Sequence, residues 1–448
     1  MSVISNILDA ILSFTTWMWT FPLLIVLIGG GIAIMVACDF IQIKHFGLAM
    51  RKCLGGARTS DSGGGKVSGW SAMIAALANT IGTGNIVGVG SAIAIGGPGA
   101  VFWMWVVGFI AMGLKFSEAT LGVATRVRDK DGNWKGGAYV YLSKVWKPLG
   151  IIWGLFASIT FPIACGVHTG AIVDAAATLS IPNLATTIVF TIIVIIVILG
   201  GMGVLIKVTD KMVPIMAGIY IVAGLLIIAL NIQNFIPTIV SIFTNAFTGT
   251  AATGGFTGAT LAVVIQNGCA RGVYSNDGGN GSASLMHSRA DTTEPVEQGL
   301  YGIFEATAST MVVCSFTALV VLCTGAWTSG DPGSVLAINA FGSIGIVGHV
   351  IAAISLILFA ASSALSIATS AGFVARDIFG KVIQRIIQAL VVVGCFIGGT
   401  IGVDAALPWI DVCNMFLILC NVGGTMFLLG TLRKLTQDYF KSGKDKLV

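Results

Sequence analysis

Long apolar stretches alternate with short polar ones along nearly the whole chain. The stretch at 185–203, ATTIVFTIIVIIVILGGMG, is typical and carries no charged residue. About 20 helical residues cross the hydrocarbon core of a bilayer, where backbone polar groups must be hydrogen-bonded within the segment. Such continuous runs do not fit barrel strands, in which apolar and polar residues alternate. The pattern therefore predicts eleven membrane-spanning helices, at 17–38, 68–96, 98–125, 147–174, 184–203, 212–231, 257–286, 299–325, 345–373, 385–402 and 409–432.

Composition supports one membrane domain over residues 1–448. Of the 448 residues, 56% are hydrophobic and 10% are charged. A soluble domain carries about 25% charged residues because its surface faces water. The first apolar stretch is not expected to be a signal peptide, because no Lys or Arg precedes it.

The basic residues predict an orientation. If the N-terminus lies outside the cell, all of the 24 Lys and Arg fall in inside segments except Lys115 and Arg271, which lie within expected spans. Basic residues concentrate in cytoplasmic loops of membrane proteins. We therefore expect a multi-pass protein of the cell (plasma) membrane with a cytoplasmic C-terminal tail at 433–448. The net charge of +5 then reflects loops beside anionic lipid and gives no reason to expect nucleic acid as a partner.

Two segments within the expected spans are unusually rich in glycine and polar residues. They are ANTIGTGNIVGVGSAIAIGGPG at 78–99 and QNGCARGVYSNDGGNGSAS at 266–284. Glycine lowers helix propensity by about 1 kcal/mol relative to alanine, and polar groups in hydrocarbon are costly unless they have partners. Irregular backbone at membrane depth is tolerated where it is buried in protein or lines a cavity. Both segments are therefore predicted to break their helices. For the first segment an alternative remains, because Gly84 and Gly88 are four residues apart and this spacing also suits simple helix–helix contact.

The positions of the two broken helices predict an inverted repeat. The second lies five spans after the first, so the two run in opposite directions. Matching interrupted helices in opposite orientation are typical of transporters built from inverted repeats. We expect a first repeat at 68–231, a second at 257–432, and an additional N-terminal helix at 17–38. Half-helix N-termini at such breaks suit a carboxylate, and freed carbonyls suit a small cation.

Several motifs resemble one family across nearly the whole chain. The glycines of 78–99, GGPGAVFWMW at 96–105, KFSEA at 115–119 and ARGVYSNDGGNGSAS at 270–284 are similar to the alanine or glycine:cation symporters. The resemblance implies an all-α LeuT-like fold, with two inverted five-helix repeats and one extra N-terminal helix. It also implies uptake of small neutral amino acids coupled to sodium, or in some members to protons.

The resemblance also assigns residues around the substrate. It implies that the backbone amides of Thr83 and Gly84 bind the substrate carboxylate, with Asn85 beside them. Tyr274 corresponds to an aromatic lid in the second broken helix. Asn276 and Asp277 correspond to the polar pair that follows it, where Glu is more usual than Asp.

A sodium site is implied next to the first break. By resemblance, the carbonyls of Ala78 and Ile81 and the hydroxyls of Ser362 and Ser363 hold the ion. A pair of serines within an apolar span agrees with this interpretation. The alternative is that both hydroxyls bond to preceding carbonyls of their own helix.

Three positions depart from the family pattern. His168 stands where Gln is common, Asn267 where Trp is expected, and Ser309 where Asp is often found. A residue smaller than Trp makes room for a larger or more polar substrate side chain. His168 could donate a hydrogen bond or titrate near neutral pH, or it could be a core histidine without solute contact.

Other charges within the expected spans have structural interpretations. Lys115 and Glu118 are spaced to pair on one helix face. Arg271 could hold Asp277 or cap freed carbonyls. Glu305 has no partner nearby in the sequence and could be a proton or gating site, or a structural tie to a break.

The sequence therefore predicts a symporter that imports a small neutral amino acid, alanine- or glycine-like and possibly larger or more polar, by alternating access driven by sodium. The alternative is proton coupling through His168, Glu305 or Asp277. A channel could share the breaks, whereas an enzyme is not expected because no nucleophile or metal cluster is apparent. The expected partners are the amino acid, sodium and the lipid bilayer, with no obligate protein partner evident.

Overall fold

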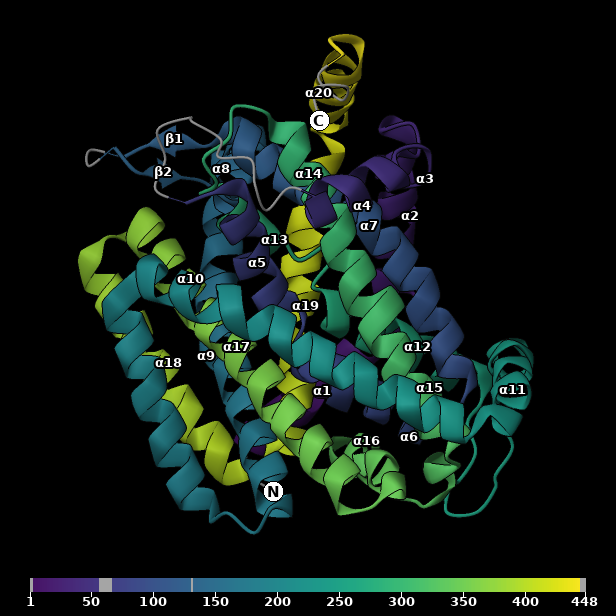
Figure 1. Cartoon of the computed structure of the whole chain (residues 1–448). Coiled ribbons are helices and arrows are strands. Elements are labelled where there is room, and N and C mark those ends of the chain that lie inside the picture. Colours follow the sequence, from purple (N-terminus) through teal and green to yellow (C-terminus); the bar gives the residue numbers. More distant parts are fainter. Residues whose placement is uncertain (1–2, 56–66, 130–131, 444–448) are drawn as a thin grey trace.

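The computed structural model describes residues 3–55, 67–129 and 132–443, and it is built almost wholly of helices (Figure 1). Within these ranges the only strands are the short antiparallel pair β1 (Val127–Arg128) and β2 (Trp134–Lys135). The helices of the first half are α1 (Val3–Thr20), α2 (Pro22–Ala37), α3 (Ile41–Lys44), α4 (Phe46–Gly55), α5 (Gly69–Thr80), α6 (Val89–Gly96), α7 (Gly99–Thr125), α8 (Ala138–Val145), α9 (Lys147–Thr178), α10 (Asn183–Leu230) and α11 (Phe235–Thr248).

The second half of the chain is also built of helices. Each half contains one π-helical segment, Gly84–Gly88 in the first half and Thr307–Cys314 in the second. The helices of the second half are α12 (Leu261–Asn276), α13 (Ala283–His287), α14 (Pro295–Ala306), α15 (Ser315–Cys323), α16 (Gly333–Phe341), α17 (Ile346–Phe379), α18 (Lys381–Ile401), α19 (Val403–Met426) and α20 (Leu429–Lys441).

Helices of membrane-spanning length dominate the structure. Among the described residues, seven are long and apolar enough to cross a membrane, and up to nine if each of two bent helix pairs forms one span. The eleven expected spans all overlap helices, but two of them share α10 and another is interrupted between α12 and α13. The count of eleven therefore stays a prediction, whereas the helical class is confirmed.

The first expected span, 17–38, differs from the observed helices. Helix begins already at Val3, and α1 and α2 meet at a bend of 41°. Pro22 opens α2, and the preceding Phe21 is not helical. Proline disfavours helical backbone in the residue before it, which explains the bend.

Helix α10 contains the expected spans 184–203 and 212–231. Its backbone leaves the helical region at Gly201, with φ 62° and ψ −154°, a conformation that glycine adopts without strain. Lys207 and Lys211 follow this turn. The element is therefore two helical segments joined at Gly201.

The interior is formed by helices that cross one another around α9 and α7. Helix α9 packs against α17, α18 and α19, and α7 packs against α12 and α14. Helices α10 and α18 lie outside, where large apolar side chains such as Ile188, Ile192 and Ile196 are exposed. In a polytopic membrane protein, a row of exposed large apolar side chains such as this one faces lipid.

The two ends of the molecule differ in charge. The N-terminus lies at one end, and α20 lies at the other, near α3, α4, α8 and the β1–β2 pair (Figure 1). These elements carry Lys44, Lys52, Arg128, Lys135 and Lys144. Of the basic residues that the sequence predicts for the inside, five lie outside the described residues: Arg58, Lys66, Lys130, Lys444 and Lys446.

The expected tail at 433–448 is in part an ordered helix. Residues up to Lys441 belong to α20, which buries Leu432, Thr436 and Tyr439 and packs against α2 and α14. Residues 444–448 lie outside the described part of the chain.

Candidate functional site

The first break separates α5 from the π-helical turn Gly84–Gly88 and α6, which together bend by 47° from α5. Asn85 Oδ1 accepts a hydrogen bond from the Gly82 N–H at 2.8 Å, and this bond satisfies one donor of the broken backbone. Glycine is required here by close approach. A Cβ on Gly82 would lie 2.1 Å from Ser363 Oγ, and one on Gly84 would lie 2.6 Å from the Tyr274 carbonyl.

The second break separates α12 from α13 and is held by a carboxylate from another helix. Asp277 ends α12 in the left-handed conformation, with φ 53°. Glu118 Oε1, from α7, accepts the backbone N–H groups of Gly279 at 2.8 Å and Gly281 at 3.1 Å. Asn421 of α19 donates to the same oxygen at 3.1 Å. The broken backbone therefore has partners for its polar groups, as burial requires.

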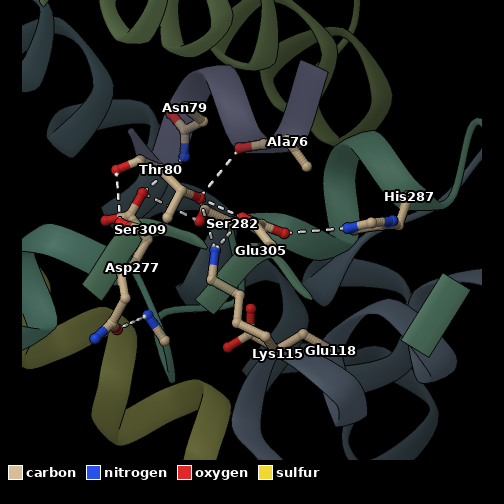
Figure 2. Close-up of polar contacts among 12 residues, drawn as sticks. Ala76, Asn79, Thr80, Lys115, Glu118, Asp277, Ser282, His287, Glu305 and Ser309 are labelled. Atoms are coloured by element: carbon tan, nitrogen blue, oxygen red, sulfur yellow. Dashed lines mark hydrogen bonds and ion pairs between the residues drawn. The ribbon is translucent and has the colours of Figure 1, made fainter. Parts of the chain in front are cut away.

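A buried charge cluster lies between the two breaks (Figure 2). Lys115 Nζ of α7 lies 2.6 Å from Glu305 Oε1 of α14 and 3.1 Å from Thr80 Oγ1 at the end of α5. Thr80 also donates to Glu305, and His287 Nε2 of α13 lies 3.2 Å from its other oxygen. All of these side chains are at most 3% exposed. The cluster therefore ties both broken helices to α7 and α14.

Two expectations about these charges are wrong. Lys115 pairs with Glu305 rather than with Glu118, because Glu118 is engaged by the second break. Arg271 pairs with Asp411 of α19 rather than with Asp277. Both observed pairs join different helices, so sequence spacing could not indicate them.

A cavity of about 40 Å³ lies between the two breaks. A volume of this order holds a few water molecules or a small solute. We call it the central cavity. Its lining residues are Asn79, Thr80, Gly82, Gly84, Thr160, Phe161, Ala164, His168, Tyr274, Asp277, Asn280, Ser282, Ile367, Ile410, Asn414 and Leu417.

Four of the expected substrate residues meet at the central cavity, namely Gly84, His168, Tyr274 and Asp277. Thr83 lies beside it, because its Oγ1 is 2.7 Å from His168 Nδ1. His168 is thus fixed by the first break, and Gly84 lies against the backbone of Tyr274. The cavity is therefore walled by both broken helices and by α9.

Asp277 faces this cavity with neutral partners. Its carboxylate accepts hydrogen bonds from Asn79 at 2.7 Å, Asn280 at 3.1 Å and Ser282 at 3.4 Å. Within the part of the chain that the structure describes, no Lys, Arg or His forms an ion pair with it. Asp277 therefore adds negative charge to the cavity wall.

The other three expected substrate residues do not line the central cavity. Asn85 points away and donates to the carbonyl and hydroxyl of Ser309 at 3.1 and 2.8 Å. Asn276 bonds to the Gly278 N–H and to Thr310, and so shapes the second break. Asn267 lines a separate cavity near α1.

The four expected cation-site residues lie together beside the first break. Ser363 Oγ donates to the Ala78 carbonyl at 2.9 Å and lies 3.5 Å from the Ile81 carbonyl. Ser362 Oγ lies 3.4 Å from the same Ile81 carbonyl but bonds at 2.8 Å to the carbonyl of Phe359 in its own helix. The alternative of bonding within the helix thus applies to Ser362, whereas Ser363 reaches across to α5.

This cluster has the chemistry of a site for a hard cation. Its donors are all oxygens, two carbonyls at a helix end and two hydroxyls. Oxygen ligands suit small hard cations, and unwound carbonyls coordinate sodium in transporters with broken helices. The cluster adjoins the central cavity, because Gly82 lines that cavity and packs so closely on Ser363 that an added Cβ would lie 2.1 Å from Ser363 Oγ.

Some cavity residues were not expected from the sequence. Asn79 lies in the first polar segment, directly before Thr80, and Asn280 and Ser282 lie in the second. The two polar segments could therefore have indicated these residues. Thr160 and Asn414 are single polar residues in long apolar helices. Their position opposite the breaks depends on how α9 and α19 pack, which no local pattern reveals.

The fold and this site define a secondary transporter with broken helices. The structure is similar to the crystal structure of MhsT in complex with L-phenylalanine, with a TM-score of 0.57 over 82% of this chain and 97% of that one, at 12% identity. That likeness shows the LeuT-like fold.

Sequence comparison gives the family. The model of the sodium:alanine symporter family matches residues 1–447, and the chain belongs to that family. The sodium/alanine symporter AgcS of Methanococcus maripaludis is 32% identical over 443 residues, covering 96% of this chain and 97% of the relative. The uncharacterized transporter YflA of Bacillus subtilis is 32% identical over 434 residues, covering 95% and 92%. The protein is therefore an amino acid:cation symporter of the membrane and not an enzyme.

Proposed function

We propose that the protein imports a small neutral amino acid, driven by the sodium gradient, by alternating access between the two sides of the cell membrane. One observation supports this proposal most strongly. The oxygens of Ala78, Ile81, Ser362 and Ser363 lie together at the first break, directly beside a cavity that fits a small solute. A relative of similar length is named a sodium/alanine symporter.

The substrate carboxylate docks on the backbone N–H groups of Thr83 and Gly84. These residues open the helical segment after the break, where N–H groups lack partners within the helix and the helix dipole favours an anion. The substrate ammonium meets the carbonyls of the breaks and the carboxylate of Asp277. A zwitterion thereby finds a group of opposite charge at each end.

The size of the central cavity favours alanine or glycine. The cavity that Tyr274 and His168 help to line has a volume of about 40 Å³, and Asn267 lies elsewhere. The room expected from Asn267 in place of Trp therefore does not adjoin the substrate in this conformation. A larger or more polar substrate would need the cavity to widen.

Sodium coupling follows from the shared first break. Sodium among the four oxygens would fix α5 against α17 and so fix the backbone on which the carboxylate docks. Each ligand then raises the affinity for the other by the same factor. Closure over the pair transports both.

The proposed organisation is two inverted repeats, 68–231 and 257–432, with 17–38 as an additional helix. The N-terminus lies outside and the C-terminus in the cytoplasm, because the elements rich in Lys and Arg gather at the end of the molecule that holds α20 (Figure 1).

Proton coupling is the second candidate, and Asp277 is the observation that favours it. Of the three acid–base groups expected for it, Glu305 is paired with Lys115, and His168 is bound to Thr83. Asp277 faces the cavity with neutral donors alone among the described residues. It could take up a proton with the substrate.

Uptake of labelled alanine, glycine, serine and glutamine into proteoliposomes tests the proposal. We expect alanine or glycine to accumulate when sodium is imposed outside, and preloaded unlabelled alanine to accelerate entry by counterflow. Liposomes without protein are the control. Uptake that ignores sodium but follows a pH gradient would replace sodium by protons, and flux without counterflow would indicate a channel.

A further inference from the structure

A cavity of about 370 Å³ lies apart from the central cavity, at the end of the molecule that holds the β1–β2 pair (Figure 1). Its walls come from four parts of the chain, namely the hairpin of β1 and β2, the stretch of α10 that follows Gly201, the residue Arg289 after α13, and the last turns of α17. We call it the hairpin cavity. No residue of either break lines it.

Basic side chains outnumber acidic ones in the walls of the hairpin cavity. Both acidic side chains are held by neighbours. Asp129 Oδ1 accepts the backbone N–H of Asn133 at 2.8 Å within the hairpin. Asp377 Oδ2 accepts the hydroxyl of Tyr139 at 2.6 Å and lies 3.6 Å from Arg289 Nη2. The cavity therefore presents an excess of positive charge, from Arg128, Lys135, Arg289 and Arg376.

The hairpin wall also holds hydrogen-bond donors with capacity to spare. Trp134 Nε1 is buried and has no hydrogen-bond partner among the described residues. The guanidinium carbon of Arg128 lies 4.2 Å from the centre of the Trp134 ring, and Arg128 Nη1 donates to the Gly132 carbonyl at 2.7 Å. A guanidinium carries five N–H donors, and this bond uses one. A buried donor without a partner calls for a ligand or ordered water, and donors on a cation favour an anion.

The wall formed by α10 is apolar and belongs to the lipid-facing surface. Met202 and Ile206 line the cavity directly after the turn at Gly201. Leu199, just before the turn, is 82% exposed. A ligand in the cavity can therefore place an anionic group among the arginines and an apolar chain along α10. Anionic phospholipids combine these two properties, and basic pockets between membrane helices bind their head groups.

We propose that the hairpin cavity binds the phosphate group of an anionic phospholipid, whose acyl chains lie along α10. Arg128 and Arg376 bind the phosphate oxygens, because guanidinium groups pair with phosphate through two parallel hydrogen bonds, and the indole N–H of Trp134 adds a neutral donor. In the proposed orientation this end faces the cytoplasm, where the leaflet is negatively charged. The inference goes beyond the proposed function and uses the proposed orientation only to name the leaflet.

A lipid in this cavity joins parts of the protein that come from both proposed repeats. The hairpin belongs to the first repeat and is already tied to α17 of the second, because Lys135 Nζ donates to the Asp377 carbonyl. A phosphate between Arg128 and Arg376 adds a contact between the same two elements and reduces the repulsion among the basic side chains. A ligand that binds only the folded protein stabilises it, so we expect the lipid to raise the unfolding temperature.

Thermal unfolding of the purified full-length protein in an uncharged detergent, titrated with phosphatidylglycerol, tests the proposal. We expect the unfolding temperature to rise to saturation. Phosphatidylcholine with the same acyl chains is zwitterionic and should leave it unchanged, as should inorganic phosphate and glycerol phosphate, which lack acyl chains. In the paired variant Arg128→Gln with Arg376→Gln, the half-saturating phosphatidylglycerol concentration should rise about thirtyfold, because each basic residue near a membrane surface contributes about fivefold.

The variant Arg433→Gln with Lys434→Gln is the matched control. It removes the same charge at the same end of the molecule, from exposed positions on α20, which packs against α2 and α14. This variant should bind the lipid like the wild-type protein. Arg128 and Arg376 are exposed as well, so both variants should unfold near the wild-type temperature before lipid is added.

Three results would overturn the lipid site. They are an unfolding temperature of the wild-type protein that ignores phosphatidylglycerol, equal weakening of binding in both paired variants, which would show that the lipid recognises only the net charge of this end, and an equal response to inorganic phosphate, which would assign the cavity to a free anion. Uptake of alanine is measured separately, so each of these results leaves the proposed function intact.

Discussion

The two breaks are built in different ways. The first, at 81–83, is held by the side-chain amide of Asn85, by His168, and by hydroxyls of α17 that donate to its carbonyls. The second, at 277–282, is held from several sides. Glu118 and Asn421 bind its glycines, and Trp153 Nε1 donates to the Asn280 carbonyl at 2.8 Å.

This difference assigns different tasks to the breaks. A backbone with few fixed partners can exchange them for ions and carboxylates, so the first break binds ligands. A backbone held by buried side chains resists rearrangement, so the second break supports the cavity and presents Tyr274 and Asp277. The charge cluster around Lys115 joins the two.

The largest expected effect concerns the cluster that joins the breaks. Lys115→Met leaves Glu305 buried with its principal cation removed, and should lower the free energy of unfolding by about 3–5 kcal/mol. Thermal unfolding of the purified protein measures the loss. The matched control adds Glu305→Gln, which removes the second charge and should restore most of the stability. A single variant that unfolds at the wild-type temperature would show that the breaks do not depend on this pair.

The next largest effect tests whether the first break is needed to bind the transported ligands. In Gly84→Ala, the added Cβ would lie 2.6 Å from the Tyr274 carbonyl and 2.9 Å from Ser275 Cα, so the two broken helices must separate. Uptake of alanine should fall about a hundredfold, or about 2.7 kcal/mol. Gly29→Ala is the control, because its Cβ meets no atom within 4 Å and uptake should be normal. Normal uptake by both variants would contradict close contact of the breaks.

A smaller effect tests the second break as a support. Glu118→Ala leaves the N–H groups of Gly279 and Gly281 without their acceptor and should lower the free energy of unfolding by about 2 kcal/mol. Glu118→Gln keeps one acceptor oxygen and should cost less. Denaturation of both variants measures the difference, and the half-saturating sodium concentration should not change in either. A shift in sodium dependence would mean that the second break also holds the ion.

The smallest effect concerns a single oxygen at the first break. Ser363→Ala removes one of four oxygens and should raise the half-saturating sodium concentration for uptake about tenfold, or about 1.4 kcal/mol. Ser366→Ala, one turn further along α17, removes a bond to the Ala75 carbonyl and is the matched control. Equal shifts in the two variants would argue that packing of α17, rather than ion binding, sets the sodium dependence.

Local sequence patterns were sufficient for the class of fold and for the location of the breaks. Apolar run length indicated helices, and the polar glycine segments indicated where the helices break, because both signals lie within a few residues. The pairings Lys115–Glu305 and Arg271–Asp411 could not be predicted in this way. Each joins helices far apart in the sequence, so it depends on how whole helices rotate and pack.

The same limit explains the placement of three asparagines. Asn85, Asn267 and Asn276 stand in the expected polar segments, yet none lines the central cavity. A side chain moves from one cavity to another if its position shifts by one helical turn, or if the helix rotates about its own axis. The sequence indicates on which helix each asparagine lies, but it does not indicate in which direction the side chain points.

The central claim is that one break holds both substrate and sodium. The most direct test is a reciprocal titration on the purified protein, with alanine affinity measured against sodium and sodium affinity measured against alanine. The two affinities should rise by the same factor, because linkage is reciprocal. An alanine affinity that stays constant from zero to saturating sodium would contradict the claim.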